Sequence, residues 1–98
     1  MEEKAKEIAE LLKILANENR LLILCALSKG AKTVSQIGEY VPKITPSALS
    51  QHLTMLKTAR ILESDKQGMN VAYSICDHRV EELLETLKTT YCNGVTLV

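Results

Sequence analysis

The sequence predicts a mainly α (α+β) domain in which five helices are combined with one β-hairpin. Apolar residues recur at helical spacing in several segments of the 98-residue chain. Between residues 61 and 75 the pattern changes to two short strands around a turn. No internal repeat or linker divides the chain, and its length suits one domain, so residues 1–98 are expected to fold together.

The first two helices are expected over residues 3–15 and roughly 18–28. The first is amphipathic, because its apolar residues share one face: Ala5, Ile8, Leu11, Leu12 and Leu15. Asn17 is a suitable N-cap for the second helix, and Gly30 is a suitable stop. This second helix is apolar nearly all round, which predicts a central position in the fold.

A short third helix and a longer fourth helix follow. Thr33 and Gln36 fit a capping box that opens a helix to about Tyr40. After a turn at 41–44, Thr45 is a good N-cap and Pro46 suits the first position of a helix that runs to about residue 59. Apolar residues at helical spacing turn one face of this fourth helix to the core: Leu49, Leu53 and Leu56.

A hairpin and a fifth helix complete the predicted fold. Strands at 61–66 and 71–75 flank Gln67-Gly68-Met69-Asn70, and Asp77 caps a helix that runs to about Tyr91. The predicted order is therefore α-α-α-α-β-β-α. A short helix, a turn, a longer helix and a hairpin form a winged helix-turn-helix, in which the second helix of the pair enters the major groove of DNA.

The solvent face of the fourth helix has the chemistry of a nucleic-acid contact. It carries small polar side chains, which suit close approach to a base edge or a phosphate: Ser47, Ser50, Gln51 and Thr54. From residue 40 to residue 62 the only charged residues are Lys43, Lys57 and Arg60. The net charge of zero does not oppose DNA binding, because the acids lie mostly in the two terminal segments.

The predicted DNA contacts fall into three groups. The fourth helix would contribute Ser47, Ala48, Ser50, Gln51 and His52 in the major groove, and the hydroxyl of its cap, Thr45, would also reach a phosphate. The basic residues Lys43, Lys57 and Arg60 would meet phosphates. The wing would contribute Lys66, Gln67 and Asn70.

Other classes of protein fit the sequence less well. The N-terminus has no apolar core of a signal peptide, and no apolar run approaches the roughly 20 residues that span a membrane, so a cytoplasmic protein is expected. Three cysteines do not suggest a disulfide scaffold. The acidic cluster of the fifth helix resembles a solvated face rather than an acid pair in a cleft, so neither an enzyme nor a cofactor is expected.

From about Leu12 to Cys92 the chain resembles the ArsR/SmtB family of winged-helix repressors. Residues 15–24, LANENRLLIL, look like the family opening L(A/S)xxxRLxIL, and residues 47–53, SALSQHL, look like its recognition-helix signature SxxSxHLxxL. Gly68 and Tyr73 fit its wing. Three residues depart from the usual pattern: Pro46 stands where a polar residue is common, Met69 replaces a frequent arginine at the tip of the wing, and Asp65 adds an acid to it.

The resemblance implies a homodimer that binds an inverted-repeat operator and leaves it when an inducer is sensed. It also implies that the first and last helices join the two copies. The expected interface residues are Ile8, Leu11, Leu12, Leu15, Leu83, Leu84, Leu87 and Tyr91.

The two best-known metal sites of the family lack their ligands in this sequence. The third helix has no Cys-x-Cys pair, and the site on the last helix, counted from Asp77, meets Arg79, Thr90 and Asn93. No metal site is therefore expected at either place. Leu24-Cys25 and Tyr91-Cys92 instead resemble the BigR/SqrR/HlyU subgroup, whose dithiol reacts with persulfides or oxidants, forms a sulfur bridge and loosens the DNA complex.

The same residues also fit several alternative roles. Cys25 sits in an apolar helix and could be a simple core residue. Cys76, after a strand, is expected to pack, or with Cys25 and Cys92 could bind arsenite or cadmium as a thiophilic inducer. His52 could be a metal or acid-base residue, but its place in the fourth helix favours a contact to DNA or support of that helix. A winged helix used only for protein–protein contact is the alternative of a different class.

Overall fold

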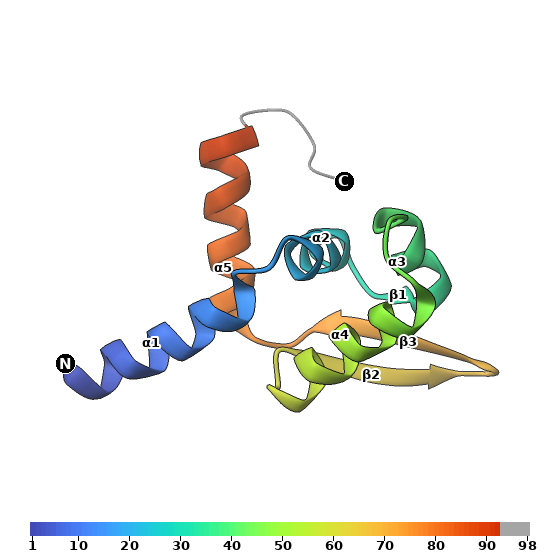
Figure 1. Ribbon diagram of the computed structural model, residues 1–98, viewed down its shortest axis with the longest axis horizontal. Coiled ribbons are helices and arrows are strands. Elements are labelled where there is room, and N and C mark those ends of the chain that lie inside the picture. The colour runs from blue at the N-terminus through green and yellow to red at the C-terminus, as the bar shows by residue number, and fades with distance from the viewer. Residues whose placement is uncertain (93–98) are drawn as a thin grey trace.

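Five α-helices and three short strands make up residues 1–92, the part of the chain that the structure describes (Figure 1). The structure is a computed structural model, and the side chain of Cys92 and residues 93–98 lie outside its described part. The helices are α1 (Glu2–Leu15), α2 (Glu18–Leu27), α3 (Val34–Tyr40), α4 (Pro46–Thr58) and α5 (His78–Leu87), and the strands are β1 (Lys32–Thr33), β2 (Leu62–Gln67) and β3 (Asn70–Ile75). The predicted winged helix-turn-helix is confirmed.

Side-chain caps start four of the helices where the sequence predicts them. Asn17 Oδ1 accepts from the backbone N–H of Arg20 at 3.1 Å, and Asp77 Oδ1 accepts from that of Arg79 at 2.9 Å. At α3 the capping box is complete, because Thr33 and Gln36 bond reciprocally at 3.3 and 2.9 Å. Each such cap satisfies a backbone donor that the helix itself leaves unpaired, which stabilises a helix by about 1 kcal/mol.

The sheet has one strand more than predicted. Its order is β1-β3-β2, and β1 pairs antiparallel with β3 through Lys32↔Tyr73 and Thr33↔Ala72. Two residues are too few to show a strand period, so the sequence did not predict β1. The hairpin of β2 and β3 closes at Gln67↔Asn70, and Gly68 at φ 64° provides the left-handed conformation of its two-residue turn.

The last helix also differs from the prediction of one continuous helix to Tyr91. The α-helix ends at Leu87, and η1 (Lys88–Cys92) follows as a π-helical turn. A π turn changes the direction of the side chains that come after it, so the apolar stripe of α5 cannot be extended to Tyr91 by 3.6-residue spacing.

The core surrounds α2, as predicted. Ile23, Leu24 and Ala26 of α2 have no solvent exposure, and side chains from every other helix and from the hairpin pack around this helix. Leu15 and Leu84, which were predicted at a dimer interface, are only 4% and 2% exposed in the single chain and belong to this core. An amphipathic stripe shows that a face is buried but does not show against what, so their place at an interface stays a prediction.

Two helices leave the compact centre. Figure 1 shows α1 extending to one side and α5 rising from the body. Residues 1–10 are all exposed, and so are the apolar side chains of Ile8 and Leu12 on α1. Within residues 1–92, no helix is both long enough and apolar enough to cross a membrane.

Candidate nucleic-acid interface

The helix α4 presents a polar face to solvent and an apolar face to the core. Leu49, Leu53 and Leu56 are at most 5% exposed, which fixes the rotation of the helix. The opposite side consists of exposed polar residues: Ser47, Ser50, Gln51 and Thr54. Thr45 Oγ1 accepts from the N–H of Ala48 at 3.1 Å, so the hydroxyl of Thr45 caps the helix, while Ala48 is half-buried.

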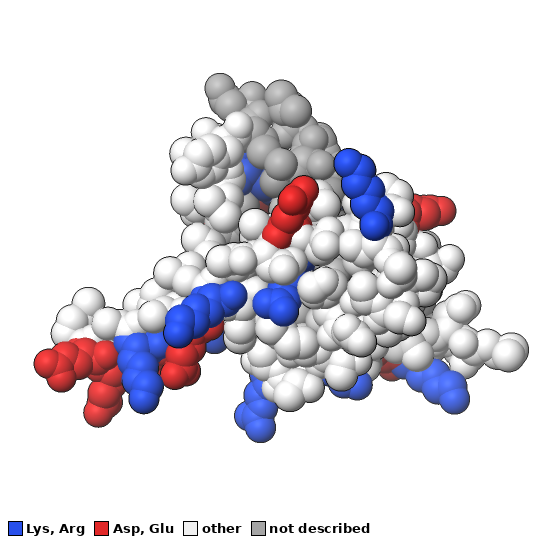
Figure 2. Space-filling model, in the orientation of Figure 1, with Lys and Arg blue, Asp and Glu red and all other residues white. Residues whose placement is uncertain are grey.

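The three basic residues around α4 are all exposed. Lys43 lies in the turn before the helix, Lys57 in its last turn, and Arg60 just beyond it with φ 63°. Lys57 Nζ also donates to Ser64 Oγ on β2 at 2.7 Å. Figure 2 shows several lysine and arginine side chains along the edge of the molecule below α4 and the hairpin, whereas acidic and basic side chains are mixed along α1.

The wing carries mixed chemistry. Lys66, Gln67 and Asn70 are exposed beside the turn. Met69, at the tip, is fully exposed, and Asp65 is exposed on β2. The polar and basic residues predicted for the wing are therefore accessible, but its tip is apolar and its strand carries an acid.

His52 differs from its neighbours on α4 because its ring is held by another helix. The ring is half-buried, and its Nδ1 accepts a hydrogen bond from Arg20 Nε of α2 at 3.3 Å. Burial, and second the positive charge of Arg20, lower the pKa of His52. The ring is thus neutral at pH 7, and the reading that His52 supports its helix gains direct structural evidence.

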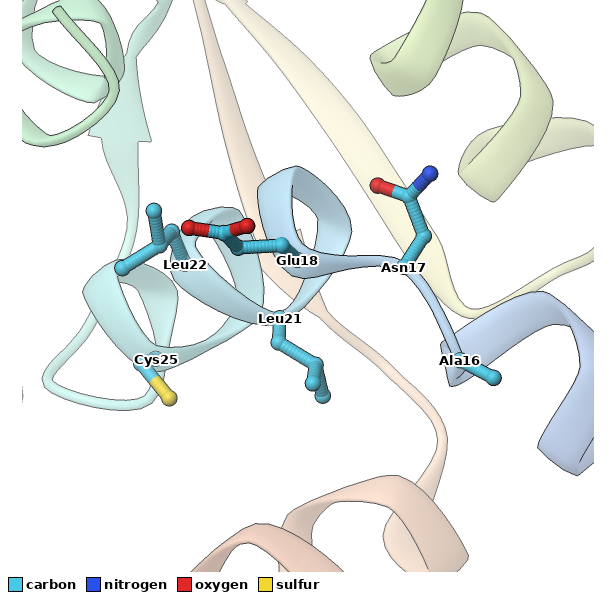
Figure 3. A pocket seen from close by; sticks show the side chains of 6 residues that line it. All are labelled: Ala16, Asn17, Glu18, Leu21, Leu22 and Cys25. Carbon is cyan, nitrogen blue, oxygen red and sulfur yellow. The ribbon is translucent and has the colours of Figure 1, made fainter.

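Cys25 lies on α2 at the wall of an apolar pocket of about 440 Å³ that is lined by α2 and the segment before it. Its residue exposure is 3%. Figure 3 shows the sulfur of Cys25 and the side chain of Leu21 pointing to the same side of α2, the side on which α5 lies. The other predicted sensor thiol, Cys92, ends η1, and its side chain lies outside the described residues.

A chain of hydrogen bonds joins the end of α5 to the end of α2. Ser28 Oγ donates to the carbonyl oxygen of Cys25 at 2.6 Å, and Lys88 Nζ of η1 donates to Ser28 Oγ. The turn that carries Cys92 is therefore attached to the turn that follows Cys25. Neither Ser28 nor Lys88 was predicted, and no local sequence signal distinguishes them.

Cys76 does not pack in the core, contrary to expectation. It is exposed, and its Sγ donates to the carbonyls of Arg60 and Ile61 at 3.4 and 3.5 Å. Partial burial, followed by the nearby carboxylates of Glu63 and Asp77, raises the pKa of the Cys76 thiol. This thiol is thus protonated at neutral pH, and it forms hydrogen bonds with two backbone carbonyls of the segment that follows α4.

The position that would carry a metal ligand on α5 holds an ion-paired arginine. Arg79 bonds Asp77 at 2.7 Å and Glu7 of α1 at 2.9 Å. In the described part of the chain, no three His, Cys, Asp or Glu side chains gather in a way that could hold a metal ion.

Known proteins resemble this chain in sequence and in fold. The family described as "Bacterial regulatory protein, arsR family" matches residues 17–64. The transcriptional activator HlyU of Vibrio cholerae is 34% identical over 94 residues, which cover 96% of this chain and 86% of HlyU. The structure of reduced HlyU matches with a TM-score of 0.88 over 94% of this chain and 96% of that chain.

Two repressor structures match as well. BigR of Xylella fastidiosa has a TM-score of 0.86 and 30% identity, and the match covers 94% of this chain and 93% of BigR. The antimony-specific repressor AntR has a TM-score of 0.79 and 36% identity, over 88% of this chain and 78% of AntR.

Proposed function

The chain belongs to the arsR family of bacterial regulatory proteins, which are DNA-binding transcriptional regulators, and we propose that it is a homodimeric repressor released from its operator by reactive sulfur species or oxidation. The observation that carries the DNA part is the exposed face of α4. Its small polar side chains are flanked by Lys43, Lys57 and Arg60, with no carboxylate on the helix itself.

The proposed roles follow from position. Ser47, Ser50 and Gln51 face the major groove, and the three basic residues meet phosphates. His52 offers its ring beside them, and Lys66, Gln67 and Asn70 approach the neighbouring groove from the wing. Proteins of this geometry bind inverted repeats as dimers, because each copy reads one half-site.

Exposed apolar residues of α1 and η1, and an apolar groove between α1 and α5, support a dimer. Ile8 and Leu12 are 50% and 48% exposed, and Tyr91 is 80% exposed. An apolar groove of about 290 Å³ runs between these helices, lined by Leu12, Leu15, Ala16, Leu21, Leu83, Leu84 and Leu87. A second copy of α1 and α5 would cover this surface. Sedimentation of the wild-type protein and of Leu12→Glu tests the dimer, because the variant should sediment as a monomer.

The sensor part of the proposal rests on the attachment of η1 to α2. Through Lys88 and Ser28 the turn that bears Cys92 is held against the helix that bears Cys25. With a persulfide RSSH as oxidant, two thiols become one disulfide, and the persulfide is reduced to RSH and H₂S. The two cysteines supply the two electrons, and their two protons are taken up in forming RSH and H₂S. A bridge from α2 to η1 would strain the packing that positions α4.

Mobility shifts on the DNA upstream of the gene test this proposal. The reduced protein should bind, and treatment with a persulfide should weaken binding, with Cys25→Ser and Cys92→Ser insensitive to it. Cys76→Ser is the matched control and should respond like wild type. Equal affinity of reduced and treated protein, or a full response of Cys25→Ser, would contradict the sensor role while leaving DNA binding intact.

A second candidate keeps the DNA binding but changes the inducer to a thiophilic metalloid. The likeness to AntR, an antimony-specific repressor, favours this hypothesis. Soft ions of this kind prefer thiolate ligands. Titration of the reduced protein with antimonite or arsenite, followed by thiolate charge-transfer absorption, separates the two inducers. A saturable band that Cys25→Ser abolishes would favour the metalloid.

A further inference from the structure

The guanidinium group of Arg20 joins three helices at one point. Arg20 belongs to the first turn of α2, where its backbone N–H is capped by Asn17. Its Nη1 donates to the carbonyl oxygen of Ile14 at 3.1 Å. This carbonyl lies in the last turn of α1, where the carbonyl oxygens receive no hydrogen bond from within the helix. Its Nε donates to Nδ1 of His52 on α4 at 3.3 Å. One side chain therefore connects the end of α1 to the helix that faces DNA.

The direction of the hydrogen bond to His52 determines the state of the ring. An arginine guanidinium carries a proton on every nitrogen and can only donate. Nδ1 of His52 must therefore present its lone pair, which leaves the ring proton of the neutral histidine on Nε2. Since His52 is half-buried and has a lowered pKa, the neutral ring is the form present at pH 7.

The tautomer has a consequence for DNA recognition. A histidine with the proton on Nε2 offers a hydrogen-bond donor at the outer end of the ring. DNA presents matching acceptors as phosphate oxygens and, in the major groove, as N7 of purines and O6 of guanine. A ring with the proton on Nδ1 would present an acceptor instead and would repel these same groups.

We propose that Arg20 is a positioning residue for DNA binding, which holds His52 as the Nε2–H donor and fixes α4 relative to the end of α1. This proposal rests on the proposed DNA-binding function. In this role Arg20 acts through His52 and makes no contact with DNA, so its charge neutralises no phosphate. The salt dependence of binding therefore distinguishes Arg20 from Lys57 and Arg60, which are proposed to contact phosphates.

Nitrogen NMR of the imidazole rings tests the tautomer directly. The chain has two histidines, and the variant His78→Gln assigns the signals that belong to His52. At pH 7.5 the ring of His52 should show an unprotonated Nδ1 and a protonated Nε2. In Arg20→Met the signals of these two nitrogens should move toward each other, because the ring can then exchange between its two neutral tautomers.

DNA titrations at several salt concentrations test the functional role. Arg20→Met should lower affinity about fivefold to tenfold, the effect of one typical hydrogen bond, with the slope of log K against log[salt] unchanged. Arg20→Lys, which can still donate one hydrogen bond, should lose less. The double variant Arg20→Met/His52→Gln should bind about as weakly as the weaker single variant, because both act through one contact.

Each result has a defined meaning. A proton on Nδ1 of His52 in the wild-type protein, which needs no variant to fold, would overturn the proposal. So would an Arg20→Met variant with a smaller salt slope, because Arg20 would then contact a phosphate, or a double variant whose losses simply multiply. Wild-type protein that binds none of its upstream DNA would instead contradict the proposed function itself.

Discussion

Lys57 Nζ donates to Ser64 Oγ at 2.7 Å, so the last turn of α4 is bonded to the first strand of the wing. The sequence predicted Lys57 as a phosphate contact, and its charge remains exposed in the structure. The hydrogen bond adds a second role, because it joins the end of α4 to β2 of the wing. One lysine therefore affects both the charge and the geometry of the DNA-binding surface.

These two roles of Lys57 can be separated by substitution. Lys57→Met removes the cation, so the slope of log K against log[salt] should fall by about 0.9, the value for one phosphate contact. Ser64→Ala keeps the cation and removes only its hydrogen-bond acceptor. It should therefore lower affinity modestly, with the slope unchanged. Fluorescence anisotropy at four salt concentrations measures both quantities.

Lys4→Met, at the N-terminal end of α1, is the matched control for loss of a lysine outside α4 and the wing. It should leave the slope as in wild type. An unchanged slope in Lys57→Met would show that this lysine makes no phosphate contact.

The tip of the wing offers a substitution that should improve binding. Met69 is fully exposed beside Gly68, and it brings no charge to DNA. Met69→Arg adds a cation at this tip, so affinity should rise and the salt slope should steepen by about 0.9. Met69→Gln, which adds polarity without charge, is the control and should leave the slope unchanged. If Met69→Arg binds like wild type, the tip does not approach the phosphate backbone.

Local signals in the sequence predicted the helices and the exposed polar face of α4 well. The caps at Thr33 and Thr45 are confirmed because a cap depends on residues only three positions apart. The exposed polar face of α4 is confirmed for the same reason, since leucine spacing alone sets the rotation of a helix.

Contacts between distant segments could not be predicted in this way. Arg20 and His52 are 32 positions apart, and Lys88 and Ser28 are 60 apart, so no spacing rule relates them. The burial of Leu15 and Leu84 in the core has the same origin, because their apolar stripes did not show that these residues pack within one chain.

The thiol of Cys76 should react slowly in the folded protein. Its pKa is raised by partial burial and by the carboxylates of Glu63 and Asp77, and the thiolate is the reactive form. In a Cys25→Ser/Cys92→Ser background, iodoacetamide at pH 7.5 should therefore alkylate Cys76 more slowly in buffer than in urea. Glu63→Gln removes one of the negative charges and should increase the native rate. Mass spectrometry of timed samples measures the alkylation rate. Equal rates in buffer and urea would contradict the claim that the Cys76 thiol is protonated and hydrogen-bonded in the folded protein.

The cap of α5 should make stability depend on pH at the acid end. Asp77 accepts from the backbone N–H and the guanidinium of Arg79, and this bonding lowers the pKa of the Asp77 carboxyl below its usual 3.8. A carboxyl with a lowered pKa in the folded state contributes stability that is complete above the unfolded pKa and is lost as the pH falls through the folded pKa. Asp77→Ala should therefore cost about 1 kcal/mol at pH 7.

The difference between wild type and Asp77→Ala should shrink as the pH falls below about 4 and the wild-type carboxyl is protonated. Urea unfolding at a fixed protein concentration measures this, because dimerisation would otherwise change the apparent stability. Asp77→Asn is the matched control. It can still accept from the N–H of Arg79 but carries no charge, so it should recover part of the loss and show no such dependence on pH. A difference that stays constant down to pH 2 would mean that the charge of Asp77 does not stabilise the start of α5.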